Sequence, residues 1–377
     1  MKRATTILIT CVGALLALGL VMLLSASVAH KAGSHLLTVQ LVSFGLGMVV
    51  CLSLALSDYR SLKKFSWVLL AFAALLLLSV FIPHFGVVSH GARRWINLRI
   101  TTFQPSEFAK LALIITLAWY AERFKRQMPG FIKGLLIPGA FISVILVLIL
   151  IGKDYGATIL LATVSGLMLL VAGVRWRFLI PTGILVVAVF AAAIAMNPVR
   201  RARVMVWFNP KPGQAALEYQ TKQSVIAFGS GGWKGVGLGE GRQKMGFVPE
   251  NHTDFILSVI GEELGLVATL TVLTTFLVLL ICGIWIAFRA RDSFGMLLAF
   301  GITSLISLQA AINVGVVTGA LPNKGLPLPF ISYGGSNLLI MLSCVGLLIS
   351  VARRAVENPF SARDPEEAED LVPSPVV

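Results

Sequence analysis

The chain has 377 residues, of which 57% are hydrophobic and 13% are charged, and its mean hydropathy is +0.88. This composition excludes a water-soluble globular protein and indicates a chain that crosses a membrane several times. The formal net charge of +14 is explained by basic residues next to apolar segments and by attraction to anionic lipid headgroups, so nucleic acid binding is not expected.

Ten apolar segments are long enough, or nearly so, to cross about 30 Å of hydrocarbon as helices. They cover residues 7–28, 37–57, 65–83, 107–121, 134–151, 155–173, 178–196, 255–288, 296–319 and 331–352. No persuasive signal-peptide cleavage site follows the first segment, so we expect it to remain as a helix. The four cysteines lie within apolar segments, with a spacing that fits neither a disulfide framework nor a zinc site. The sequence therefore predicts an all-α polytopic membrane protein with ten transmembrane helices.

The distribution of Lys and Arg predicts the orientation of these helices, because short cytoplasmic loops collect basic residues. With the N-terminus inside, sixteen of the 31 basic residues fall in cytoplasmic segments and six in short outer loops. Both termini are therefore expected in the cytoplasm, and residues 197–254, between helices 7 and 8, form a large extracytoplasmic loop. Residues 1–355 form one membrane domain, and the acidic, proline-containing segment 356–377 is predicted to be a disordered cytoplasmic tail.

The outer loop at 84–106 carries a pair of arginines next to an aromatic residue, Arg93 and Arg94 before Trp95. Such a group is typical of an interfacial anchor, but two guanidinium groups also suit a pyrophosphate on a lipid. We favour the second interpretation, because the positive-inside rule disfavours basic residues in a short outer loop.

The fourth apolar segment has charged residues in its first turns. Pro105 marks a helix start, and Glu107 lies in the first turn, where the helix dipole favours an acid. Lys110 then lies about one turn inside the membrane, where an ammonium group needs an acceptor unless it reaches the interface. That acceptor is either Glu107, three residues earlier, or a substrate phosphate, and the sequence leaves both open.

The large outer loop contains two distinctive segments. Residues 199–208 alternate arginines with apolar residues, which predicts a helix lying in the interface. Seven glycines follow between positions 229 and 241, but their spacing fits no nucleotide-binding motif. We expect them to allow close packing of backbone against a bulky ligand or a tight re-entrant turn.

The most informative segment is Pro249–Ile256, P-E-N-H-T-D-F-I, which places an acid at the outer mouth of the eighth helix. A carboxylate at that position indicates a functional site. Below Asp254 lies a stripe of small residues, Ser258, Gly261 and Gly265, which is either a helix-packing seam or a substrate groove. Glu262 lies about 12 Å deeper, so a retaining pair of carboxylates is not expected. His252 and Thr253 are candidates to position a sugar or a metal ion, with a helix cap as the alternative for Thr253.

The last outer loop, residues 318–336, contains three prolines and several glycines. Irregular backbone at membrane depth is tolerated only against protein or a cavity, so this loop is predicted to form a wall of the same site.

Together these segments resemble the SEDS family of shape, elongation, division and sporulation proteins. The motifs that carry the resemblance are S-A-S at 25–27, G-A-R-R-W-I at 91–96, F-Q-P-S-E-F-A-K at 103–110, P-E-N-H-T-D-F-I at 249–256, G-E-E-L-G at 261–265 and L-P-L-P-F-I-S-Y-G-G-S at 326–336. One departure is Gly152-Lys153-Asp154, where the family usually has Gln-Pro-Asp. The segments L-P-N-K-G-L at 321–326 and G-R-Q-K at 241–244 are closer to the division members than to the elongation members.

The resemblance implies a peptidoglycan glycosyltransferase that polymerises lipid II, inverts the anomeric centre and releases undecaprenyl pyrophosphate. It implies action at the outer face of the cytoplasmic (inner) membrane at the division septum, with a class B penicillin-binding protein and other division membrane proteins as partners. Asp254 would be the catalytic base. The substrate-binding candidates are Arg93, Arg94, Gln104, Glu107, Lys110, Asp154, Lys244, His252, Thr253, Ser258, Glu262, Ser332, Gly334, Gly335 and Ser336. A divalent cation, Mg²⁺ or Mn²⁺, is a possible assistant near Asp254.

Three alternatives stay open. An elongation-type polymerase would have the same chemistry. A lipid II flippase or a proton-coupled exporter would place ionisable groups near the bilayer midplane. Most polar candidates gather at the outer helix ends, which favours surface chemistry, although Glu262 and Glu263 keep transport open. A scaffold that only recruits partners would not need an acid and bases at one helix mouth.

Overall fold

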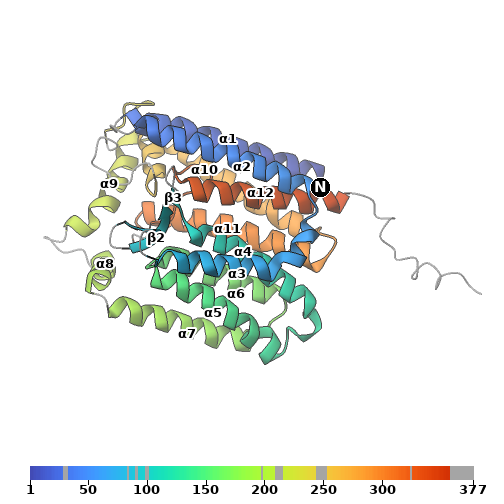
Figure 1. Cartoon of the computed structure of the whole chain (residues 1–377). Helices are drawn as coiled ribbons and strands as arrows, with labels where there is room; N and C mark the ends of the chain where they lie inside the picture. The colour runs from blue at the N-terminus through green and yellow to red at the C-terminus, as the bar shows by residue number, and fades with distance from the viewer. Residues whose placement is uncertain are drawn as a thin grey trace, which may run out of the picture.

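The computed structural model describes residues 1–28, 33–82, 85–89, 92–97, 102–196, 198–208, 215–242, 253–322 and 325–356. Long helices form one bundle with their axes roughly aligned (Figure 1). These helices are α1 Lys2–Val28, α2 Gly33–Leu56, α3 Leu62–Ser79, α4 Pro105–Arg123, α5 Ile137–Ile151, α6 Tyr155–Val171, α7 Trp176–Ala195, α10 Ile256–Phe288, α11 Ser293–Val317 and α12 Gly335–Val356. Two further helices, α8 Pro198–Phe208 and α9 Ala215–Gly231, lie between α7 and α10 in the chain, and single turns occupy Tyr59–Ser61, Lys125–Gln127 and Ile132–Leu136.

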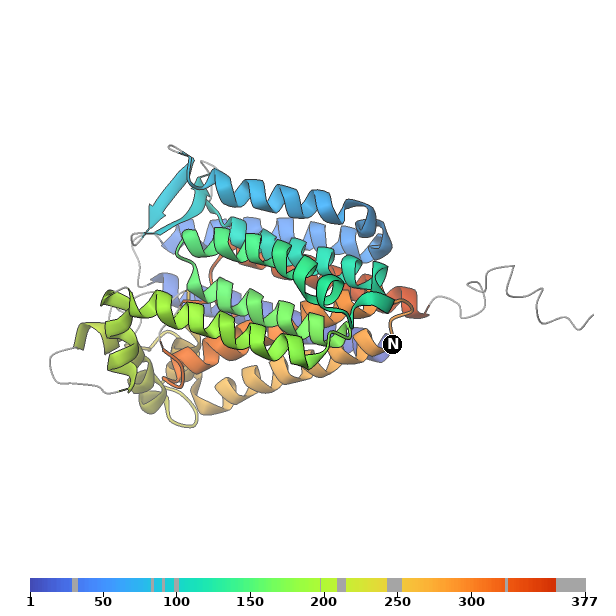
Figure 2. The ribbon, with the colours of Figure 1, turned by 90° about the horizontal axis from the view of Figure 1, so that it is seen from below.

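The bundle has two different ends. The N-terminus and the last turn of α12 lie at one end, which we call the N-terminal end (Figure 1). The β-strands, α8 and α9 lie at the opposite end, which we call the hairpin end, and the view from below shows the same division (Figure 2). Helix α8 confirms the helix predicted at 199–208.

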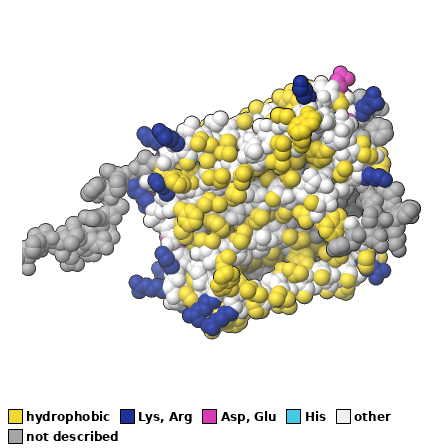
Figure 3. Space-filling view, turned by 180° about the vertical axis from the view of Figure 1, so that it is seen from behind, with side chains coloured by type: hydrophobic (Ala, Val, Ile, Leu, Met, Phe, Trp, Pro, Cys, Tyr) yellow, Lys and Arg dark blue, Asp and Glu magenta, His cyan; other side chains and the backbone are white. Residues whose placement is uncertain are grey.

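The side surface of the bundle is apolar, as a membrane requires. On the face that the space-filling view shows, hydrophobic side chains are spread between the two ends, and Lys and Arg gather at the ends (Figure 3). Eight described helices are long and apolar enough to cross a membrane. Helix α6 has only 17 residues, and α4 carries several charged groups but is buried along most of its length. Helix α7 is the opposite case, because it buries no side chain. A multi-pass helical membrane protein is therefore confirmed.

The structure is mostly helical, as predicted, but the loop at 84–106 also contains β-strands that the sequence analysis did not predict. Three antiparallel strands occur there, β1 Gly86–Ser89, β2 Ala92–Asn97 and β3 Thr102–Phe103, in the order β1-β2-β3. Val87 pairs with Trp95, and Ile96 pairs with Phe103. Valine, isoleucine and aromatic residues favour such pairs, and Ile96 buries its side chain. The consequence for function is that Arg93 and Arg94 stand on a strand.

Helix α10 is kinked where the glycine-rich segment 231–242 packs against it. Gly265 has φ 78° and ψ −174°, which breaks the helical hydrogen-bond ladder. The N–H of Leu266 donates to Gly232 O (2.9 Å), and the N–H groups of Val236 and Gly237 donate to the carbonyls of Glu262 (2.9 Å) and Glu263 (3.0 Å). The glycines therefore allow one backbone to replace the hydrogen bonds that the kink removes from the other.

This packing also explains the small-residue stripe and the paired glutamates. A Cβ atom added to Gly261 would overlap the ring of Phe228 on α9, so the stripe is a packing seam at this position. Glu263 is completely buried and accepts hydrogen bonds from Ser25 Oγ (2.7 and 2.8 Å) and from Gly239 N (3.0 Å). The S-A-S segment at the end of α1 and the G-E-E-L-G segment of α10 thus meet in the structure.

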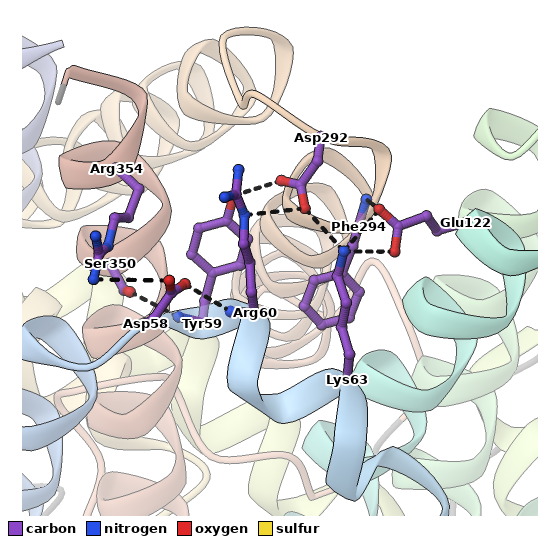
Figure 4. Close-up of polar contacts among 9 residues, drawn as sticks. All are labelled: Asp58, Tyr59, Arg60, Lys63, Glu122, Asp292, Phe294, Ser350 and Arg354. Carbon is purple, nitrogen blue, oxygen red and sulfur yellow. Dashed lines mark hydrogen bonds and ion pairs between the residues drawn. The ribbon is translucent and has the colours of Figure 1, made fainter. Parts of the chain in front are cut away.

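At the N-terminal end, an ionic cluster joins four separate segments (Figure 4). Lys63 of α3 pairs with Glu122 of α4 (2.7 Å) and with Asp292, just before α11 (3.2 Å). Asp292 also accepts a hydrogen bond from Tyr59 Oη (2.5 Å), whose backbone N–H donates to Ser350 Oγ on α12 (3.3 Å). One acid therefore holds the α2–α3 turn against the start of α11.

The packing of segment 231–242 on α10 predicts a strong effect of Gly235→Ala. Gly235 has φ 81°, and an added Cβ would overlap the backbone of Glu263. We expect a loss of about 2 kcal/mol or more in the free energy of unfolding, measured as a lower thermal midpoint in detergent. Gly229→Ala is the matched control, because an added Cβ there meets nothing within 4 Å. Equal midpoints for the two variants would contradict this packing.

Candidate active site

Asp254 lies immediately before α10, and two side chains hold its backbone. Asn313 Nδ2 on α11 donates to Asp254 O (2.7 Å), and Ser332 Oγ donates to the preceding carbonyl, Thr253 O (2.6 Å). The side chain of Asp254 is half-buried and lies against Gly325, where an added Cβ would overlap Oδ2. The carboxylate is therefore placed by contacts to its own main chain and by a glycine that leaves room for it.

The segment 325–334 is irregular, as its prolines predict, and forms one wall of the site. Ser332 Oγ accepts a hydrogen bond from Leu328 N (2.8 Å) while donating to Thr253 O, so it links this wall to the Asp254 segment. Gln40 of α2 fixes the wall from behind, since it accepts from Gly334 N (3.2 Å) and donates to Ser332 O (3.4 Å).

The structure favours Glu107 as the acceptor of the Lys110 ammonium group. Lys110 is completely buried, and Nζ lies 2.9 Å from Glu107 Oε1 and 2.8 Å from Oε2. It also donates to Gln309 Oε1 on α11 (2.9 Å). With no exposed surface, the ammonium group does not meet a phosphate in this conformation, and its contacts tie α4 to α11.

A second polar cluster surrounds Asp154, the N-cap residue of α6. Its Oδ1 accepts from Ala157 N (3.2 Å), and its Oδ2 accepts from Gln104 Nε2 (3.0 Å) and Ser106 Oγ (3.2 Å) at the start of α4. Arg94 Nη1 lies 4.0 Å from Oδ1, and Nη2 donates to Lys153 O (2.6 Å). Asp154 therefore holds the arginine strand against the starts of two helices.

The Asp154 cluster and Asp254 meet at Gly325 and Leu326. A Cβ atom added to Gly156, two residues after Asp154, would lie 3.1 Å from Leu326 Cγ and 3.5 Å from Gly325 O. Gly325 in turn contacts the Asp254 carboxylate. The short segment at Gly325 and Leu326 therefore separates Asp254, just before α10, from Asp154, which Arg94 of β2 contacts at the start of α6.

The other predicted site residues fall into three groups. Gly334, Gly335 and Ser336 lie at the start of α12, where Ser336 Oγ accepts from Gln104 N (3.0 Å) and Gly335 packs on Ser43. Ser258 is buried and donates to Phe255 O in its own helix (2.7 Å). Lys244 and His252 lie outside the described residues.

The structure corrects the capping alternative for Thr253, whereas a role of Glu262 in binding substrate stays a prediction. The N-cap of α10 is Phe255, so Thr253 is not the helix cap. Glu262 is buried and accepts from Arg242 N (3.0 Å). This contact assigns Glu262 to the glycine-rich segment, and its placement gives no support for a role in binding substrate.

Gln309 and Asn313 were missed by the sequence analysis. Both are amide side chains buried on α11, and the contacts above connect them to Lys110 and Asp254. The available signal was their spacing: two amides four residues apart in an otherwise apolar segment face the same side of a helix.

A divalent cation near Asp254 stays a prediction. Among the described residues, no three His, Cys, Asp or Glu side chains gather so that they could hold a metal ion. The described residues therefore do not fit a metal site, and no chemical step is assigned to a cation.

Comparisons with known proteins place the chain among cell wall proteins. The model of the cell cycle protein family FtsW/RodA/SpoVE matches residues 5–357. The probable peptidoglycan glycosyltransferase FtsW of Geobacter metallireducens is 40% identical over 364 residues, which cover 95% of this chain and 97% of that protein. Stage V sporulation protein E of Bacillus subtilis is 36% identical over 344 residues, covering 90% and 94%.

A solved structure is also similar over most of the chain. It is described as structural coordination of polymerization and crosslinking by a peptidoglycan synthase complex. It matches with a TM-score of 0.77 and 28% identity, and the match covers 93% of this chain and 98% of the other.

The buried ion pair makes a quantitative prediction. Because Glu107 and Lys110 are both buried, removing one leaves the other charge without its partner. We expect Glu107→Leu and Lys110→Met each to cost about 3–5 kcal/mol of stability, and the double variant to cost clearly less than the sum. Thermal unfolding of the four proteins in detergent measures this coupling. Additive losses would mean that the two side chains do not depend on each other.

Proposed function

The chain belongs to the FtsW/RodA/SpoVE family of cell cycle proteins, and we propose that it is a peptidoglycan glycosyltransferase that polymerises lipid II during septal cell-wall synthesis. The full-length match to a relative named as a peptidoglycan glycosyltransferase supports the activity. The observation that carries the site is the placement of Asp254, whose backbone is fixed and whose carboxylate stands half-buried at the outer end of α10.

In this proposal the bundle spans the cytoplasmic membrane ten times, with α4 and α6 completing the set of spans. The N-terminal end faces the cytoplasm, and residues 197–254 form the outer loop. Residues 1–355 are one membrane domain. The predicted cytoplasmic tail, 356–377, lies outside the described residues except for the last residue of α12. The excess of basic residues in the segments assigned to the cytoplasm supports this orientation.

Asp254 acts as the general base in the proposed reaction. It accepts the proton of the attacking sugar hydroxyl, while the bond between the anomeric carbon and the pyrophosphate of the donor breaks. The anomeric centre inverts, so one carboxylate is sufficient and no covalent intermediate is needed. The helix dipole favours the charged carboxylate at the start of α10, so it is ready to accept a proton.

Arg94, with Arg93 beside it, stabilises the leaving pyrophosphate. Arg93 is exposed and Arg94 half-buried, so their guanidinium groups can reach a lipid headgroup, whereas Lys110 is enclosed by Glu107 and Gln309. We therefore assign charge stabilisation to the arginines and a structural contribution to Lys110.

The proposed partner is a class B penicillin-binding protein that crosslinks the glycan product. The similarity to a chain of a peptidoglycan synthase complex supports such an association. The 40% identity to a protein named FtsW and the two segments that resemble the division members, 241–244 and 321–326, support location at the septum, with an elongation-type polymerase as the alternative.

Transport of lipid II is the second candidate function. It is favoured by the acids and the lysine buried inside the bundle, Glu107, Lys110, Glu262 and Glu263. However, Lys110, Glu262 and Glu263 each bond to protein groups that hold helices or the glycine-rich segment together, which is a structural use of buried charge. Translocation of fluorescent lipid II across proteoliposomes, measured beside polymerisation, separates the two functions.

The assigned base predicts the result of Asp254→Asn. The amide keeps the shape of the side chain and cannot accept the proton, so we expect polymerisation to fall about 10²- to 10⁴-fold. The measurement is the length distribution of glycan strands made from fluorescent lipid II by the purified protein with its partner. Thermal stability and partner binding serve as controls and should not change. Normal glycan ladders from a folded Asp254→Asn protein would remove Asp254 from the mechanism.

The assigned pyrophosphate site predicts that Arg94→Ala weakens binding of lipid II by about tenfold, because one charge-assisted contact is lost. Binding to protein in nanodiscs measures the affinity. Arg177→Ala is the matched control, since Arg177 is an exposed arginine at the start of α7, whose first turn lies at the N-terminal end. The same affinity in Arg94→Ala and the wild type would end the pyrophosphate assignment.

A further inference from the structure

Helix α11 presents two amide side chains on one face, at Gln309 and Asn313. Gln309 is fully buried and Asn313 is 2% exposed. Residues four apart lie above one another on a helix. A polar group that is buried in a membrane bundle has to find its partners within the protein, so the partners of these two amides show what they hold.

Gln309 uses both ends of its amide. Its Oε1 accepts from Lys110 Nζ on α4 (2.9 Å), and its Nε2 donates to Pro327 O (2.9 Å). Because Lys110 is also paired with Glu107 (2.8 Å), Gln309 connects a buried ion pair to the irregular segment that forms the wall of the site.

Asn313 uses both protons of its amide nitrogen. Its Nδ2 donates to Leu326 O (2.7 Å) and to Asp254 O (2.7 Å). The two amides therefore take neighbouring carbonyls of one segment, Leu326 and Pro327, and Asn313 adds the main chain of the acid. A path of four hydrogen bonds runs from Lys110 through Gln309, residues 326–327 and Asn313 to Asp254.

The acceptor end of Asn313 strengthens this interpretation. Among the residues that the structure describes, its buried Oδ1 has no hydrogen-bond partner. A buried acceptor without a partner costs stability, so stability alone does not account for an amide at this position. The two donated hydrogen bonds, which only the nitrogen end can make, account for it.

We propose that Gln309 and Asn313 are positioning residues that hold Asp254 at a fixed place relative to the Glu107–Lys110 pair. This inference rests on the proposed function, in which Asp254 is the base. Neither amide needs to touch the substrate. Asn313 binds the main-chain carbonyl of Asp254 itself, and Ser332 binds the carbonyl of the residue before it. These bonds fix the backbone that carries the carboxylate, and a displacement of about 1 Å can lower a rate about 10²-fold.

The first test separates positioning from substrate binding. Asn313→Leu and Gln309→Met remove the amides and keep the approximate volume. We expect kcat of lipid II polymerisation to fall about 10- to 100-fold, with KM within about threefold of the wild type, because an interaction that acts only through the base affects kcat. An increase in KM with unchanged kcat overturns the proposal, because it makes the amides substrate contacts.

Gln309→Glu tests the path itself. The carboxylate still accepts from Lys110 but no longer donates to Pro327 O, so kcat should fall between the values of the wild type and Gln309→Met. Thr303→Val is the matched control, because Thr303 is also buried on α11 and its hydroxyl donates only to Ala299 O of its own helix (2.7 Å). Loss of activity in Thr303→Val equal to that in Asn313→Leu overturns the proposal.

The second test does not depend on activity. Hydrogen exchange of the full-length protein in nanodiscs should be about tenfold faster in Asn313→Leu for peptides that cover 253–260 and 325–331, and unchanged in Thr303→Val. Unchanged exchange in Asn313→Leu refutes positioning. If exchange changes as expected but the wild type with its partner makes no glycan, the proposed function fails and the positioning stands.

A folded protein is needed for both tests. Should Asn313→Leu not fold, Asn313→Asp replaces it, because an aspartate of the same shape cannot make both donated bonds. If Asn313→Asp has the same hydrogen exchange and the same kcat as the wild type, the proposal is overturned. Faster exchange together with a lower kcat supports it.

Discussion

Backbone that is not helical inside a membrane bundle has to be satisfied by the protein, and this constraint organises both unusual regions of the structure. At the kink of α10, the glycine-rich segment supplies N–H groups to the carbonyls of Glu262 and Glu263. In the wall at 325–334, side chains of α11 and Ser332 supply the partners. The candidate site lies at the wall, because Asn313 and Ser332, which bond the backbone of the wall, also bond the backbone at Thr253 and Asp254.

Burial divides the ionisable groups into two classes. Glu107, Lys110 and Glu263 are enclosed and paired with protein groups, so they act as connections between helices. Asp254 and Arg94 are half-buried at the hairpin end, so neither is enclosed as fully as the first class. The proposed chemistry is therefore assigned to the groups with partial access.

Local patterns predicted most of the helices, because apolar length is a property of a single segment. The orientation drawn from Lys and Arg stays a prediction. Local patterns also pointed to Asp254 and Arg94, whereas Asp154 came from the resemblance to the family. Asp254 and Asp154 stand just before helices and Arg94 stands on β2, and their roles in the reaction stay predictions. Contacts between distant segments were not predictable in this way. The kink at Gly265 depends on contacts with residues 232–237. The roles of Gln309 and Asn313 depend on backbone carbonyls in the loop that follows α11. The strands between 86 and 103 are too short to give a clear alternating pattern in the sequence. A single sequence contains no signal of which carbonyl will be left without a partner.

Helix α7 has a consequence for the response of the protein to its lipid environment. None of its 20 residues is fully buried, and half-buried side chains such as Phe178 and Leu179 pack it against the bundle. In a membrane, lipid tails would cover much of its surface, so its tilt would respond to the thickness of the bilayer. Its length is about 30 Å, close to that of an average hydrocarbon core, and a thinner or thicker membrane changes its angle at modest cost. Helix α8 follows after two residues, so a change in membrane thickness moves the beginning of the large loop. The composition of the bilayer is thus a physical variable that acts on this protein from outside its own packing.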